Sequence, residues 1–164
     1  MFILFIAVTG MPQGVYGQKI ELNDPQIISI LKTMSQIDLE YSYIGKSKRM
    51  DNSVDSLIDV MIKKQELILD EVYELENHLI LSPQPNIITR ILLLAGEDRT
   101  SELNRINSNC NESIFVGRKM SYYKKGIFII EEILIPQAKN KILRQFLSDN
   151  IMIWECLYKM IEEI

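Results

Sequence analysis

Apolar residues recur along most of this chain at alternating steps of three and four, which is the period of an amphipathic α-helix. Between residues 25 and 44 these positions are Ile27, Ile30, Met34, Ile37, Tyr41 and Ile44. Asp24-Pro25 is typical of a helix start, with an N-cap followed by a proline whose missing N–H costs nothing there. Gly45 is a suitable stop, so the pattern predicts a first helix over 25–44.

A second segment shows the same spacing without interruption. Its apolar seam comprises Val54, Ile58, Met61, Ile68, Val72, Leu75 and Leu79, with Gln65 at the one polar position. Asn52 or Ser53 is a suitable N-cap, and Ser82-Pro83 ends the segment. The pattern predicts a helix of about 40 Å.

Three further helices are expected. The first runs from 87, capped by Asn86, to about 109, with a possible break at 96–99. The second covers 116–134, and Pro136 either kinks or ends it; residues 127–130 could also open a strand, but no second strand is available to pair with it. The third covers 139–163, with a possible division at 148–149.

These segments predict an all-α fold, an antiparallel helical bundle of about five amphipathic helices with one long helical hairpin. Residues 18–164 suit one domain with a genuine core. Gln65 and Asn150 each interrupt an apolar seam. They either fix the register of packing from inside the core or are partly exposed.

The N-terminus predicts a cleaved signal peptide over residues 1–17. Residues 1–8 are all apolar, and helix-breaking residues follow before Val15-Tyr16-Gly17, which suits a cleavage site. The alternative is a buried N-terminal helix or strand. The apolar run is too short to span a bilayer. The expected location is therefore outside the cytosol, either periplasmic or extracellular.

Export changes how the two cysteines are interpreted. In an oxidising compartment Cys110 and Cys156 are expected to form one disulfide, whereas the alternative is two small buried side chains. Asn111-Glu112-Ser113 also fits a glycosylation sequon, which matters only in a eukaryotic secretory pathway.

The side chains offer little for catalysis. His78 is the only histidine, and a histidine in a last helical turn is favoured by the helix dipole. The sequence contains no glycine-rich phosphate loop and no Cys-x-x-Cys pair. We therefore expect no enzyme activity, no cofactor and no metal. The net charge of −4 also disfavours nucleic-acid binding, and any membrane contact should be peripheral at most.

Two surfaces are candidates for binding. The seam of the second helix could contact a protein partner or a second copy of the chain. A cluster of cations and tyrosines could hold an anionic ligand, or it could be an ordinary solvated helix face: Arg118, Lys119, Tyr122, Tyr123, Lys124 and Lys125. The leading hypothesis is a non-catalytic interaction or structural subunit. The alternative is a helical carrier for a small apolar ligand.

Overall fold

The computed structural model describes residues 21–48, 50–105 and 111–164, and this part of the chain is all-α, as predicted. Its elements in order are α1 (Asp24–Ser47), α2 (Asn52–His78), α3 (Ile87–Arg105), α4 (Asn111–Ile129), the π-helical turn η2 (Ile130–Leu134), α5 (Ile135–Gln137) and α6 (Lys141–Glu162). Residues 127–130 are helical, so the helix prediction was right and the strand alternative was wrong.

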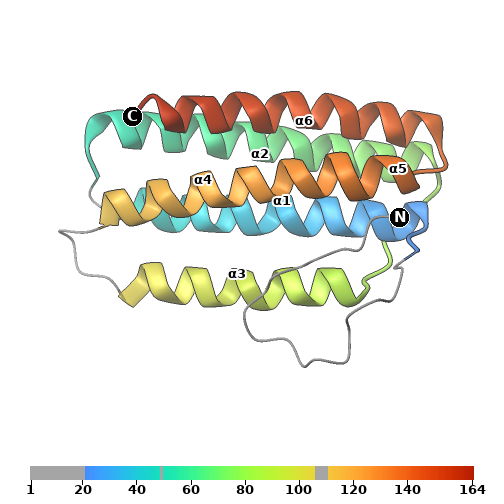
Figure 1. The fold of residues 1–164 in the computed structure, drawn as a ribbon, viewed down its shortest axis with the longest axis horizontal. Coiled ribbons are helices and arrows are strands. Elements are labelled where there is room, and N and C mark those ends of the chain that lie inside the picture. Colours follow the sequence, from blue (N-terminus) through green and yellow to red (C-terminus); the bar gives the residue numbers. More distant parts are fainter. Residues whose placement is uncertain (1–20, 49, 106–110) are drawn as a thin grey trace.

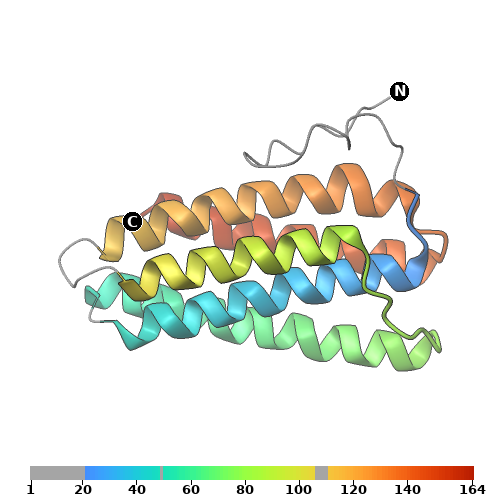
Figure 2. The same ribbon diagram turned by 90° about the horizontal axis from the view of Figure 1, so that it is seen from below.

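The long helices lie lengthwise beside one another (Figures 1 and 2). α1 packs against α2 on one side and α3 on another, while α4 packs against α6, which also touches α2. α1 and α2 run in opposite directions, whereas α3 runs in the same direction as α1 (Figure 1). The bundle therefore includes one pair of parallel neighbours besides the α1–α2 hairpin.

Asparagine caps explain where α1 and α6 begin. The Asn23 side chain accepts a hydrogen bond from the backbone N–H of Gln26, and the Gln26 side chain accepts one from the N–H of Asn23. Asp24, which the sequence suggested as the cap, is the first helical residue instead. Its carboxylate accepts hydrogen bonds from the backbone N–H groups of Lys139 and Asn140, which ties the start of α1 to the start of α6.

Two predicted helix interruptions are absent, since α3 continues through 96–99 and α6 through 148–149. Gly96 has a packing role in α3 because a Cβ there would lie 3.0 Å from a side-chain carbon of Ile37. Glycine thus lets α3 approach α1 closely without breaking the helix.

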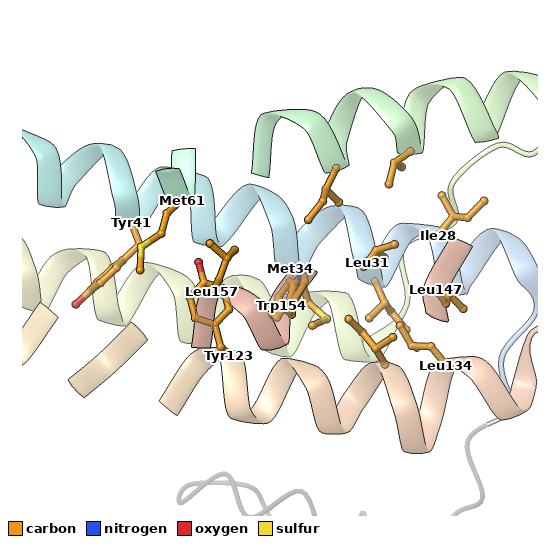
Figure 3. Packing of buried hydrophobic residues seen from close by; sticks show 14 of the residues in the cluster. Ile28, Leu31, Met34, Tyr41, Met61, Tyr123, Leu134, Leu147, Trp154 and Leu157 are labelled. Atoms are coloured by element: carbon orange, nitrogen blue, oxygen red, sulfur yellow. The ribbon is translucent and has the colours of Figure 1, made fainter. Parts of the chain in front are cut away.

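The core is shared by α1, α2, α4 and α6, and Ile88 and Leu103 of α3 also belong to it. Figure 3 shows Met34 of α1, Met61 of α2, Tyr123 of α4 and Trp154 of α6 among its buried members. Trp154 is the largest fully buried side chain, and its ring packs directly on the backbone of Gly126. This contact holds α6 close against α4.

Candidate functional site

The apolar seam predicted on α2 packs into the chain's own core. Leu79 is partly buried and the other six members are buried: Val54, Ile58, Met61, Ile68, Val72 and Leu75. Side chains that the bundle already covers cannot meet a partner. The expectation that this seam is an interaction surface is therefore wrong, because the other helices of the same chain cover it.

The six residues of the predicted anionic-ligand patch do not form one surface. Arg118, Lys124 and Lys125 are exposed, whereas Lys119 and Tyr123 are 1% and 0% exposed. Tyr122 is partly buried, and its hydroxyl donates to the backbone oxygen of Met34 at 2.6 Å. The helical turn of α4 separates these neighbours in sequence, so the patch prediction is wrong as a unit.

The buried members instead form a polar cluster between α1 and α4. The Lys119 ammonium donates to Asp38 Oδ1 at 2.6 Å, to the backbone oxygen of Asp38 at 2.9 Å and to Ser42 Oγ at 2.6 Å. The Tyr123 hydroxyl donates to the second carboxylate oxygen, Asp38 Oδ2, at 2.7 Å. Every member of the cluster is buried.

Burial dominates the electrostatics of this cluster. It lowers the pKa of Lys119, an effect that the Asp38 carboxylate opposes. Burial next to Asp38 raises the pKa of Tyr123 well above its ordinary value. The Lys119 side chain has three acceptors within hydrogen-bond distance, which matches the three donors of an ammonium group. The arrangement suits a structural ion pair rather than a nucleophile.

A small pocket adjoins the cluster. Its walls include Ile37, Tyr41, Arg99 and Tyr122, and its volume of about 10 Å³ is close to the room that one water needs. The guanidinium of Arg99 lies 5.2 Å from the centre of the Tyr122 ring. The pocket is too small for a substrate or an apolar ligand.

Gln65 and Asn150 are also buried, at 0% and 1% exposure, so the interpretation of both as partly exposed residues was wrong. Asn150 Nδ2 donates to the backbone oxygen of Phe146 at 2.9 Å. Gln65 lies near enough to Tyr123 to affect the pKa of its phenol, yet neither amide atom has a hydrogen-bond partner in the described structure. Both residues place polar groups inside the core, as the alternative interpretation required.

Sequence reasoning missed the Lys119–Asp38 pair, although each residue carried a signal. Lys119 lies four residues from both Phe115 and Tyr123, which are buried on the same face of α4. Asp38 directly follows the seam residue Ile37 of α1. A buried ion pair is indicated when a lysine occupies a core position of one helix and an acidic residue occupies a core position of another.

A second feature is an open groove of about 560 Å³ on the outer side of α1 and α2. It is lined by Gln36, Leu39, Glu40, Tyr43, Ile44 and Ser47 of α1 and by Leu69 of α2. The Tyr43 side chain is 49% exposed, and its hydroxyl donates to Glu66 Oε1 on α2 at 2.5 Å. This hydrogen bond raises the pKa of Tyr43. Leu39 and Ile44 are partly exposed in this groove, which makes it a candidate contact surface.

The remaining predictions concern the chain ends and the cysteines. Residues 1–17, with the predicted signal peptide, and Cys110 lie outside the described residues. Cys156 is a free, exposed thiol on α6. The Cys110–Cys156 disulfide stays a prediction, because the structure does not describe Cys110.

The described residues contain no group of three histidine, cysteine or acidic side chains placed to hold a metal ion. Nor is any helix in the described ranges long and apolar enough to cross a bilayer. Comparison with protein families, with curated proteins and with solved structures finds no match to this chain.

Proposed function

We propose that this chain is a non-catalytic helical interaction subunit that contacts a protein through the open groove of α1 and α2. The observation that carries the proposal is the groove itself, where Leu39, Ile44 and Tyr43 line a solvent-open hollow. Apolar side chains that gather in a solvent-open hollow are a common feature of protein contact surfaces. The α2 seam plays no part in the proposal.

The carrier alternative fits the observed pockets less well. A carrier for a small apolar ligand needs an enclosed apolar cavity of roughly 300–1,000 Å³. The enclosed pocket beside Asp38 has about 10 Å³, and the larger hollow is open to solvent. A surface contact is therefore the better supported of the two functions.

A photo-crosslinking amino acid at position 43 tests the proposed contact in the native cells. We expect one adduct of defined mass from position 43 and none from a matched control at Gln145, which is exposed on α6. Equal adducts from both positions, or none from either, would contradict the groove as the contact surface. Sedimentation of the purified chain would show whether the partner is a second copy.

We also propose that the chain is exported, to the periplasm or outside the cell, because residues 1–17 have the apolar pattern of a signal peptide. The intact mass of the protein recovered from its native cells tests it. A mass starting at Gln18 supports export, and an increase of two hydrogens on reduction would support the Cys110–Cys156 disulfide. A full-length mass with free thiols would overturn both.

A further inference from the structure

We infer that the partner segment in the α1–α2 groove is a cationic amphipathic helix of about three turns, an inference that rests on the proposed function. Both the shape of the groove and the charges along its edges point to this chemistry.

The shape comes from the helical stripe of α1. Its lining residues run from Gln36 to Ser47, eleven residues apart, which corresponds to roughly 16 Å of groove or three helical turns. Leu39 and Ile44 lie between polar neighbours of the same stripe, and Leu69 adds an apolar side chain from α2. A hollow of this length with an apolar floor suits the apolar face of a short helix.

The groove edges are acidic. Contacts between the helices show which α2 acids face α1: Glu66 binds Tyr43, Glu76 pairs with Lys32, and Asp55 and Asp59 pair with Lys46. Glu40 of α1 lines the groove, is exposed, and makes no ion pair within the described part of the chain.

These five carboxylates face only two lysines, so the edges carry a net charge of about −3. Glu40 and Glu66 are the two carboxylates without a lysine partner among these contacts. Lysines or arginines flanking the apolar stripe of a partner helix would meet them, whereas an acidic partner would be repelled.

The probes for the test are three synthetic peptides of roughly fourteen residues. The first places leucines at helical three-four spacing with lysines elsewhere. The second replaces its lysines by glutamine, and the third has the composition of the first with its leucines scattered around the helix. Each is titrated into the ¹⁵N-labelled full chain, and the amide shifts of Leu39, Ile44 and Leu69 report occupation of the groove.

We expect the lysine peptide to shift the groove amides and to bind at least roughly tenfold more tightly than the glutamine peptide. Substituting Glu40→Gln together with Glu66→Gln should weaken the lysine peptide roughly fivefold. The matched control, Glu132→Gln with Glu155→Gln, removes two exposed carboxylates from η2 and α6 and should leave affinity unchanged.

Each other outcome has a definite meaning. Equal groove binding by the glutamine peptide would overturn the cationic partner but leave the groove as a protein-binding surface. Equal shifts with the scattered peptide would reduce the effect to non-specific attraction and overturn the inference. Concentration-dependent groove shifts without peptide would make a second copy the occupant. If no peptide shifts the groove amides, the inference fails, and the position-43 crosslink then decides the proposed function separately.

Discussion

Gly126 has no side chain, and this allows α4 and α6 to pack closely together. A Cβ at this position would overlap the Trp154 ring, which is fully buried. Gly126→Ala should therefore lower the free energy of unfolding by about 1–3 kcal/mol or more, because the ring has no free space to enter. Urea unfolding followed by circular dichroism measures the change.

Gly117 is the matched control, since it lies in the same helix with no atom within 4 Å of its would-be Cβ. Gly117→Ala should raise the free energy of unfolding by roughly 0.5–1 kcal/mol, because alanine costs less backbone entropy in a helix. A loss of stability at position 117, or none at position 126, would contradict this packing of α4 on α6.

Ile80 is a β-branched residue in a glycine conformation. Its φ of 52° lies in the left-handed region and its side chain is 92% exposed. It follows α2, where the backbone N–H of Leu81 donates to the Glu76 oxygen at 2.9 Å, as in a Schellman cap. Ile80→Gly should stabilise the protein by roughly 0.5–1 kcal/mol through relief of strain.

The thermal midpoint measures this gain, and Ile80→Ala is its control. Alanine retains a Cβ and so keeps most of the left-handed penalty, which predicts a much smaller gain than glycine gives. If alanine and glycine stabilise equally, the benefit comes from removing exposed apolar surface and not from the backbone.

At the scale of the element, the helices were readable from the sequence because each buries one stripe of side chains. The seam of α2 illustrates this, since Val54, Ile58 and Met61 are all fully buried. What periodicity could not reveal was which helix would cover that stripe. The same pattern fits a seam for a partner and a seam for the chain's own core.

The candidate site was harder to predict for a different reason. Lys119 and Asp38 lie 81 residues apart, and neither counts as apolar in a periodicity analysis. Lysine in a basic run is normally solvated, so local context favoured the surface. Only the packing of α4 on α1 brings the two charges together, and that is a property of the assembled bundle.

The Lys119–Asp38 pair couples α1 to α4. Lys119→Met should cost about 3–5 kcal/mol, because it leaves the Asp38 carboxylate buried without its cation. The double variant Asp38→Asn with Lys119→Met should lose clearly less than the two single losses added together. A double-mutant cycle in urea measures this coupling.

The exposed pair Lys46–Asp59 is the control for that cycle. Lys46→Met should change stability little, since both partners remain in water. Additive losses at Lys119 and Asp38 would mean that the two charges are solvated separately and that their burial does not couple the helices.

The whole molecule should be sensitive to alkaline pH. Burial raises the pKa of Tyr41 from 10.0 to about 12 and raises those of Tyr122 and Tyr123 well above 10.0. A raised pKa means that the folded state holds its proton where the unfolded state has lost it. Stability from these three phenols is therefore complete below pH 10 and is lost as the pH rises above it.

Lys119 acts in the opposite direction, because burial lowers its pKa from 10.5 and stability from this group rises until the unfolded lysine also deprotonates. The stabilising effect of Lys119 stops growing near pH 10.5, whereas the loss from the three tyrosines continues above that pH. The urea midpoint should therefore fall steadily from pH 10 upward.

In Tyr123→Phe the urea midpoint should be lower at neutral pH, because the hydrogen bond to Asp38 is missing. It should also decline less steeply above pH 10, because one buried phenol has been removed. Tyr73→Phe, which changes a tyrosine that is 46% exposed, is the control. A midpoint that stays constant between pH 9 and pH 11 would show that these tyrosines are not buried in the native fold, and the core that joins α1 to α4 would need a different arrangement.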